Sequence, residues 1–342
     1  MKKICFIVNP ISGTTAKKNI VGLIPKYFKE PDFLAEIKYT EHPGHATQLA
    51  AEAAGEGFDI VVAVGGDGTV NEVARSLVHT TVALGIIPCG SGNGLARHLA
   101  IPTNVVKAMK ILQEAQIEKL DYGRLNNLYF FCTCGVGFDA FVSDKFAQSG
   151  KRGLLTYVEN TLVEGVRYKP EEYELVVDGE RQQFKAFLIA CGNASQYGNN
   201  AYITPKASMS DGLLDVTVME PFPLISAPQI LLQMFNKSLD ENSHIRSFRC
   251  KSLKILRKKP GVVHYDGDPI LIDGDLDISL VSKGINMVIN ANGKVQVSPI
   301  LRAFTDIYSG ISSGMQQIGQ GMNSTGEQIR KFNNDLLNKL KN

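Results

Sequence analysis

A glycine-rich segment, Gly65 to Thr69, constrains the fold of this chain more than any other stretch, because it joins two different patterns. Before it, Ile60 to Val64 is a continuous and mostly β-branched apolar run, which predicts a strand buried on both faces. After it, a helical pattern begins. The carboxyl end of such a strand is where an open α/β sheet binds its ligands. Glycines let backbone N–H groups approach a ligand closely and a helix N-terminus favours anions, so we expect a phosphate chain here.

Asp67 stands inside this segment, although a carboxylate repels phosphate groups unless a divalent cation or a proton-bearing group lies between them. We therefore expect magnesium-linked nucleotide chemistry. A second glycine-rich loop, Gly90 to Gly94, follows the next apolar run, Ala83 to Pro88. A plain strand-to-helix turn is the alternative interpretation, but it explains neither Asp67 nor the second loop.

Strand and helix patterns alternate over the N-terminal third of the chain. The strand patterns cover residues 4–8, 35–40, 60–64 and 83–88, and the helical patterns cover residues 19–28, 45–55 and 105–113. This alternation predicts a parallel, doubly wound sheet whose strands all end at one edge. Asn9, Thr40 and Gly65 directly follow three of these strands, so we expect them to lie together.

From about Asp121 onward the segments are short, alternating and bounded by turn residues, which predicts mostly antiparallel β structure. Two helical patterns, at residues 154–166 and 224–235, interrupt it. A chain of 342 residues also exceeds one ordinary hydrophobic core. We therefore expect an α/β domain followed by a β-rich domain.

Composition excludes some classes of partner and of site. The 36 basic and 34 acidic residues give a net charge of +2, which offers no reason to expect a nucleic acid partner. The six cysteines are scattered and mostly lie in apolar runs, so we expect buried thiols in a reducing compartment. For Cys132 and Cys134, packing is a better explanation than metal binding. No stretch is long enough to span a membrane, which predicts a cytoplasmic protein.

Residues 301–342 form a C-terminal tail with one apolar face, whose members keep spacings of three and four residues. The opposite face carries no charge between Ile307 and Gly326, and several glycines weaken its helicity. Uncharged polar faces of this kind occur in lipid-packing sensors, so transient peripheral membrane contact is one expectation. Docking on the body of the chain and pairing into a homodimer are the alternatives.

Six segments together carry a resemblance to a known family. They are residues 9–13, 65–69 with 71–72, 88–93, 135–140, 210–215 and 265–268. The chain resembles the diacylglycerol kinase catalytic family, specifically its soluble bacterial branch, and is similar to sphingosine and ceramide kinases. The resemblance extends over residues 3–300. It implies an NAD kinase/diacylglycerol kinase-like, ATP-binding α/β domain at residues 1–122 that includes a returning segment at about 293–300. It also implies a β-sandwich lipid-acceptor domain at residues 123–292, with a cleft between the domains.

The resemblance implies roles for individual residues as well. Asp67 would align the nucleotide, and Asp266 would be the general base that takes the proton from the acceptor hydroxyl. A structural turn is the alternative role for Asp266. The family usually has Glu where this chain has Asp268, which leaves the contact of that residue with nucleotide or metal open. The remaining nucleotide positions are Asn9, Ser12, Thr40, Gly65, Gly66, Gly68, Thr69, Asn71, Glu72, Ser91, Gly92, Asn93 and Arg152.

Three further positions are assigned by the same resemblance. Arg152 lies where sphingosine kinases supply arginines to the ATP phosphates, although a solvated basic turn explains it equally well. Asp211 matches a residue that holds a structural Mg²⁺ in bacterial relatives, together with the backbone carbonyls of Ser208 and Leu213. Asp139 lies where long-chain-base kinases are acidic near the lipid headgroup, but the same residue is common in the diacylglycerol branch.

These features predict an ATP- and Mg²⁺-dependent lipid kinase that phosphorylates a hydroxyl of a diacylglycerol-like or long-chain-base lipid. Because the acceptor lies in a bilayer, we expect the enzyme to contact the membrane peripherally. One alternative is an NAD kinase-like enzyme, which shares the Gly-Gly-Asp-Gly segment. The other is a non-catalytic nucleotide- or lipid-binding regulator.

Overall fold

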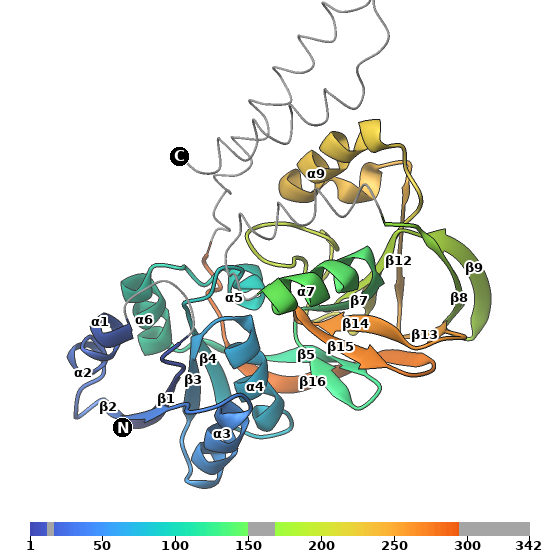
Figure 1. Ribbon diagram of the computed structural model, residues 1–342. Helices are drawn as coiled ribbons and strands as arrows, with labels where there is room; N and C mark the ends of the chain where they lie inside the picture. Colours follow the sequence, from blue (N-terminus) through green and yellow to red (C-terminus); the bar gives the residue numbers. More distant parts are fainter. Residues whose placement is uncertain (12–16, 150–167, 294–342) are drawn as a thin grey trace, which may run out of the picture.

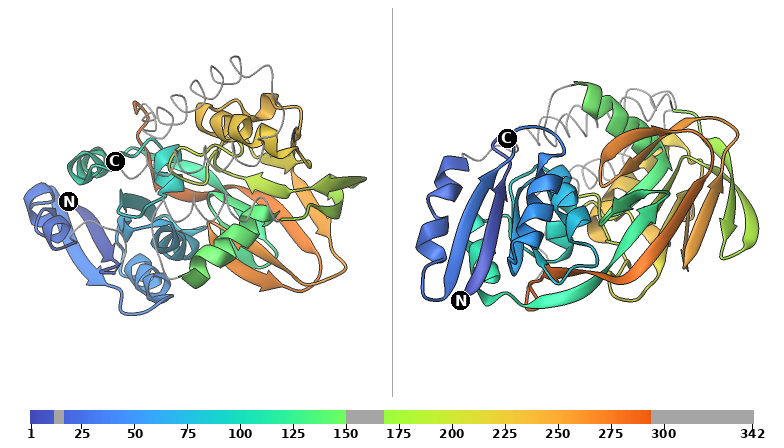
Figure 2. Two further views of the ribbon diagram at one scale, coloured as in Figure 1. Left: turned by 45° about the horizontal axis from the view of Figure 1, so that its top comes forward. Right: turned by 90° about the horizontal axis from the view of Figure 1, so that it is seen from below.

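The chain has an α/β part followed by a β-sandwich, and the computed structural model describes residues 1–11, 17–149 and 168–293. Figure 1 shows helices on both sides of the blue sheet, with the green to orange strands beyond it. In the views of Figure 2, the orange strand β16 (Leu276–Val288) runs between the two parts. The predicted fold class, a doubly wound α/β domain with a C-terminal β-sandwich, is confirmed.

Four parallel strands make up the N-terminal part of the larger sheet. In spatial order they are β2 (Phe33–Tyr39), β1 (Lys2–Val8), β3 (Ile60–Gly65) and β4 (Ala83–Pro88). All three pairings are parallel, so the four strands end at the same edge of the sheet. Every residue of β3 and β4 is buried, because helices cover both faces, and this explains their continuous apolar runs.

Helices pack on both faces of these strands. They are α1 (Lys17–Val21), α2 (Ile24–Tyr27), α3 (His45–Gly55), α4 (Asp67–Leu77), α5 (Gly94–His98) and α6 (Val105–Glu114). The first two and α6 share one apolar cluster, whereas α3, α4 and α5 belong to another. The single helix predicted over residues 19–28 is wrong. Pro25 lies in the first turn of α2, and because proline has no N–H group it starts a new helix there.

The C-terminal part is a sandwich of antiparallel strands. Its first layer continues the larger sheet with β5 (Ile117–Leu125), β6 (Leu128–Phe130), β8 (Glu171–Val177), β9 (Glu180–Ala186), β13 (Ser252–Leu256) and β16. Its second layer consists, in spatial order, of β12 (Ile245–Cys250), β11 (Leu214–Met219), β10 (Leu188–Gly192), β7 (Thr133–Gly137), β14 (Gly261–Tyr265) and β15 (Asp268–Ile272). Their inward side chains form one buried cluster between the layers. The helical segments are α7 (Phe138–Ser149), η1 (Leu224–Ser226), α9 (Ala227–Asn236) and η2 (Leu239–Glu241).

The apolar segment at residues 129–134, one of the short strand patterns expected in the β-rich domain, is split into β6 and β7. Between them, Phe131 and Cys132 direct their backbone N–H groups to the carboxylate of Asp266. Because these donors bond to a side chain, they are not available to a neighbouring strand. The break therefore has a specific cause, which lies more than a hundred residues further along the chain.

The strand β16 joins the two parts of the molecule. It pairs with β5 and β13 in antiparallel fashion, and Asn286 and Met287 near its end pair with β4 in parallel. A register shift between Val281 and Ile285 bends the strand, which lets it belong to both parts. The strand thus reaches β4 at Asn286 and Met287, whereas the predicted return at about residues 293–300 lies, apart from residue 293, outside the described part.

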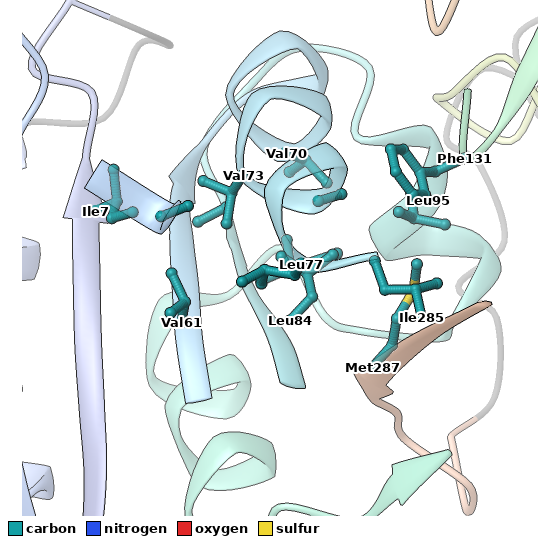
Figure 3. Close-up of a cluster of buried hydrophobic side chains, with 14 of the residues drawn as sticks. Ile7, Val61, Val70, Val73, Leu77, Leu84, Leu95, Phe131, Ile285 and Met287 are labelled. Carbon is teal, nitrogen blue, oxygen red and sulfur yellow. The ribbon is translucent and has the colours of Figure 1, made fainter. Parts of the chain in front are cut away.

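One apolar cluster extends across the boundary between the parts (Figure 3). Val70, Val73 and Leu77 on α4 lie in it together with Ile285 and Met287 on β16, and all five are buried. The two predicted domains thus share both a sheet and a core. We expect any change that shifts β16 to shift α4 as well.

Other predictions concern single features. All six cysteines are buried and none forms a disulfide, as expected. No helix in the described residues is both long and apolar enough to cross a membrane. Ser12, Arg152, the helical pattern at residues 154–166 and the tail at 301–342 lie outside the described residues.

Candidate functional site

Two glycine-rich loops meet at the carboxyl edge of the parallel strands. The first joins β3 to α4, and the second, Gly90 to Gly94, joins β4 to α5. A Cβ atom built on Gly66 would lie 3.2 Å from the Cα of Gly90, and one built on Gly90 would lie 2.6 Å from the Cα of Gly66. Because the obstacle is backbone, neither position accepts a side chain unless the loops separate. The two loops therefore form one backbone surface.

Asp67, the first residue of α4, connects these loops. Its Oδ2 accepts a hydrogen bond from the backbone N of Asn93 at 2.8 Å, and its Oδ1 accepts one from the backbone N of Gly94 at 2.7 Å. We call these three residues the Asp67 junction. Burial raises the pKa of Asp67, whereas the two N–H groups favour its ionised form. Backbone N–H groups at the start of α5 thus give each carboxylate oxygen one hydrogen-bond donor.

The side chain of Asn93 stabilises the second loop by two hydrogen bonds within it. Its Oδ1 accepts from the backbone N of Gly90 at 2.9 Å, and its Nδ2 donates to the carbonyl of Gly90 at 2.7 Å. Its backbone has a φ of 55°, a left-handed conformation that asparagine tolerates well. The side chain predicted to contact a nucleotide is therefore occupied in shaping the loop. Ser91, by contrast, is exposed at the loop's tip, with half-buried Gly92 beside it.

The predicted meeting of residues at the ends of β1, β2 and β3 is confirmed. The Nδ2 of Asn9 donates to the Oγ1 of Thr69 at 3.1 Å, which ties the end of β1 to α4. The backbone N of Thr40 donates to the carbonyl of Val8 at 3.0 Å. Gly65 lies against Thr69, because a Cβ atom there would be 2.5 Å from the threonine Cβ.

Glu72, which stays a predicted nucleotide contact, has a structural role in the ligand-free protein. Its two carboxylate oxygens accept hydrogen bonds from the backbone N of Gly44 at 2.9 Å and of Ala46 at 3.2 Å. Gly44 is the N-cap residue of α3 and makes no side-chain cap of its own. Glu72 therefore caps α3 from the neighbouring helix α4.

Asp266 lies at the tip of the hairpin between β14 and β15, and its carboxylate accepts four hydrogen bonds. Its Oδ1 accepts from the backbone N of Cys132 at 2.7 Å and of Thr133 at 3.1 Å. Its Oδ2 accepts from the backbone N of Phe131 at 2.8 Å and from the Nδ2 of Asn71 at 2.9 Å. We call these five residues the Asp266 junction. Burial raises the pKa of Asp266, and the four donors oppose that shift.

These four donors fill the lone-pair sites of a carboxylate. A general base needs a lone pair directed at the proton that it removes. In this arrangement the carboxylate has a structural role, and its role as the general base stays a prediction. Asn71 is similarly occupied, because its amide also donates to the carbonyl of Tyr129 at 3.0 Å. Both residues connect α4 to the β-sandwich.

Asp268 is the acidic residue at this hairpin that remains available. Its Oδ2 lies 3.6 Å from the position of a Cβ atom built on Gly68, at the start of α4. The residue as a whole is exposed. Burial of its carboxylate, followed by the charges of Asp266 and Asp67, raises the pKa of Asp268 to about 6.

Arg97 is a candidate that sequence reasoning missed. Its Nε donates to the carbonyl of Gly92 at 3.0 Å, which places a cation directly behind the second loop. Burial lowers the pKa of Arg97 and the carboxylate of Asp67 raises it. A basic residue three positions after the loop was the available signal, but in the sequence it reads as the surface of a short helix.

The predicted magnesium segment is described in full. The Oδ1 of Asp211 accepts from the backbone N of Leu213 at 3.1 Å, and its Oδ2 lies 3.6 Å from Nη1 of Arg249. Among the described residues, no three histidine, cysteine, aspartate or glutamate side chains are grouped as metal ligands. A single carboxylate oriented by its own loop is compatible with an ion bound otherwise through backbone oxygens and water.

Comparison with known proteins matches both parts of the chain to family models. Residues 3–125 match the diacylglycerol kinase catalytic domain, and residues 132–283 match the YegS C-terminal NAD kinase beta sandwich-like domain. The gap between the two matches, residues 126–131, contains β6 and ends at Phe131, which belongs to the Asp266 junction.

Individual relatives agree with these matches. A diacylglycerol kinase of Mycobacterium tuberculosis is 31% identical over 277 residues, which cover 78% of this chain and 88% of that protein. One of Bacillus subtilis is 26% identical and covers 78% and 90%. The crystal structure of a diacylglycerol kinase from Bacillus anthracis str. Sterne has the same fold, with a TM-score of 0.66 and 23% identity over 86% of this chain and 98% of that one. The chain therefore belongs to the diacylglycerol kinase catalytic-domain family.

Proposed function

We propose that this protein is a lipid kinase that transfers the γ-phosphoryl group of ATP to a hydroxyl of a diacylglycerol-like or long-chain-base lipid. The observation that carries the proposal is the contact of two glycine-rich loops at the carboxyl edge of a parallel sheet. Each loop leads directly into a helix. The relatives named diacylglycerol kinase favour a lipid over NAD as the acceptor.

The nucleotide is proposed to lie along these loops. The first N–H groups of α4 have no partner within the helix, and with the glycine backbone they favour the phosphates. Gly65, Gly66, Gly68 and Ser91 supply backbone and hydroxyl groups at this surface, while the Asp67 junction keeps the loops in register. Arg97 adds positive charge behind the second loop. Arg152 stays a proposed phosphate ligand.

Mg²⁺ is proposed at two places. One ion accompanies ATP, where it neutralises the phosphate oxygens during transfer. The other is the structural ion proposed from Asp211 with the carbonyls of Ser208 and Leu213. The hydrogen bond from the backbone N of Leu213 orients the carboxylate of Asp211 for that purpose.

The acceptor is proposed to reach the β-sandwich from a membrane, through peripheral contact. The tail at residues 301–342 is the proposed membrane contact, and homodimer pairing remains its alternative. Whether the tail binds a membrane or pairs into a homodimer does not decide which acceptor is phosphorylated.

The test is a transfer assay with γ-labelled ATP and Mg²⁺. Diacylglycerol, monoacylglycerol, ceramide and sphinganine are offered separately in mixed micelles, and NAD is offered in solution. We expect label in one lipid class and none in NAD. Asp32→Asn, at an exposed position far from the loops, is the control variant and should leave transfer unchanged. Label in NAD would establish the alternative enzyme, and tight ATP binding without any labelled product would establish a regulator.

A further inference from the structure

A loop between β10 and β11, residues 193–201, packs backbone to backbone on the second glycine-rich loop. A Cβ atom built on Gly198 would lie 2.8 Å from the Cα of Gly92, and the backbone N of Asn199 donates to the carbonyl of Gly92 at 3.0 Å. Gly198, Asn199 and Asn200 all have positive φ angles, of 121°, 51° and 62°. Glycine and asparagine adopt such angles more easily than most residues. The sandwich thus places a loop of its own directly against the second glycine-rich loop.

Further hydrogen bonds attach the 193–201 loop to its neighbours. The backbone N of Ser195 donates to the Nδ1 of His98 on α5 at 3.1 Å, and the Oγ of Ser195 lies 2.9 Å from the same atom. Burial lowers the pKa of His98 to about 4, so its ring is neutral near pH 7 and its Nδ1 can accept. The Sγ of Cys132, between β6 and β7, donates to the carbonyl of Gln196 at 3.0 Å. The loop is therefore fixed to the α/β part as well as to its own sheet.

Tyr197, in the middle of this loop, connects it to the sandwich. The hydroxyl of Tyr197 donates to the Oδ2 of Asp139, in the first turn of α7, at 2.8 Å. The same oxygen lies 2.9 Å from the Nε2 of His264 on β14, and the side chains of Asp139 and His264 are both buried. Gly135 on β7 makes room for them, because a Cβ atom there would lie 2.6 Å from that Oδ2 and 3.0 Å from that Nε2. A series of hydrogen bonds thus connects the second glycine-rich loop with the hairpin between β14 and β15.

We infer that Tyr197 is a positioning residue, whose hydroxyl holds the hairpin between β14 and β15 at a fixed place relative to the second glycine-rich loop. The inference rests on the proposed function, which assigns the nucleotide to that loop and the acceptor to the sandwich. The reacting atoms must approach to about 3–3.5 Å, and a misplacement of about 1 Å can cost about a hundredfold in rate. Because the glycine-rich loops belong to the α/β part and the hairpin belongs to the sandwich, the links between the two parts set this distance.

The hairpin is then held against both glycine-rich loops. The Asp266 junction attaches it to α4, which begins in the first loop, and Tyr197 attaches it to the second. The carboxylate of Asp139 is oriented for this purpose, because its Oδ1 accepts from the backbone N of Ala140 at 2.8 Å and its Oδ2 is left to the tyrosine and the histidine. A ligand that orders the second glycine-rich loop should therefore order β14 as well.

Hydrogen exchange of the full chain tests this connection, with the non-hydrolysable ATP analogue AMP-PNP and Mg²⁺ as the probe. In the wild type we expect the analogue to slow exchange in residues 90–94 and also in residues 261–266, which contain β14. In Tyr197→Phe, which removes only the hydroxyl, the protection of residues 90–94 should remain. The protection of residues 261–266 should fall at least about threefold, with the affinity for the analogue within about threefold of the wild type.

Turnover gives a second readout on the lipid that the wild type phosphorylates. Tyr197→Phe should lower turnover at least about tenfold and leave the KM for ATP within about threefold. The double variant Tyr197→Phe/Asp139→Asn should lose no more turnover than Asp139→Asn alone, because the two side chains share one hydrogen bond. Tyr27→Phe is the matched control and should change neither readout, since this half-buried tyrosine lies on α2, on the opposite face of the parallel strands from α4 and α5.

The outcomes separate this inference from the proposed function. Full protection of residues 261–266 in Tyr197→Phe, or protection of residues 90–94 alone in the wild type, would overturn the inference and leave the kinase proposal intact. Additive losses in the double variant would also overturn it, because Tyr197 would then act through another contact. A wild type in which the analogue protects neither glycine-rich loop would overturn the inference and the proposed nucleotide site together.

Discussion

The Asp67 junction and the Asp266 junction solve the same physical problem in different parts of the molecule. Each directs backbone N–H groups at a half-buried carboxylate, and each ties together segments that are distant in sequence. The Asp67 junction connects two loops within the α/β part, 26 residues apart at Asn93. The Asp266 junction connects the two parts of the molecule, 195 residues apart at Asn71.

The difference teaches what each carboxylate contributes. Two donors at Asp67 fix the shape of the surface that the two glycine-rich loops form. Their loss should therefore mainly weaken the binding of a ligand at that surface. Four donors at Asp266 attach the hairpin between β14 and β15 to α4 and to the segment between β6 and β7. Their loss should therefore lower the stability of the whole fold. Asp268 belongs to neither junction, which leaves it available for chemistry.

The largest effect on stability is expected from Asp266→Asn. An amide has one acceptor oxygen, so its NH₂ group would face two of the four donors, and unsatisfied buried groups of this kind cost about 1–3 kcal/mol each. We expect the free energy of unfolding to fall by about 3 kcal/mol, measured by urea denaturation. Asp273→Asn, on an exposed residue just beyond β15, is the matched control. A loss below about 1 kcal/mol would mean that these four hydrogen bonds contribute little to the stability of the fold.

A smaller loss of stability, with a large loss of ligand binding, is expected from Asp67→Asn. Its amide would face one of the two backbone donors, which predicts a loss of about 2 kcal/mol. Because the loops then lose their register, ATP binding should weaken and turnover should fall at least about a hundredfold. Calorimetric titration with Mg-ATP measures the first effect. Unchanged affinity in the folded variant would contradict the assignment of the loops to the nucleotide.

The smallest effect, and one of opposite sign, is expected from Asp268→Asn. The folded pKa of Asp268 is raised to about 6, so ionisation in the folded state opposes folding above that pH. The variant should be more stable than the wild type by about 1 kcal/mol at pH 8, after allowance for solvent screening of an exposed residue. The gain should shrink as the pH falls below 6 and vanish only well below the ordinary aspartate pKa of 3.8, where the carboxyl is protonated in both states. Equal stability of the two proteins at pH 8 would show that the carboxylate is well solvated.

Much of the α/β part could be predicted from the sequence. The buried strands, the glycine-rich loops and the shared edge at Asn9, Thr40 and Gly65 all follow from local patterns, since strand burial and turn chemistry depend on neighbouring residues. The prediction of one helix at residues 19–28 is wrong for a local reason too, because Pro25 starts a new helix.

The sequence by itself therefore determined which segments become strands, where the glycine loops lie and which carboxylates stand near them. Only the tertiary structure decided what those carboxylates do. Glu72 caps a helix that begins 27 residues before it, and Asp266 bonds to donors more than a hundred residues away. The reason is that a carboxylate's role depends on which donors reach it. Those donors are backbone N–H groups, which every residue but proline carries and which leave no mark in the sequence.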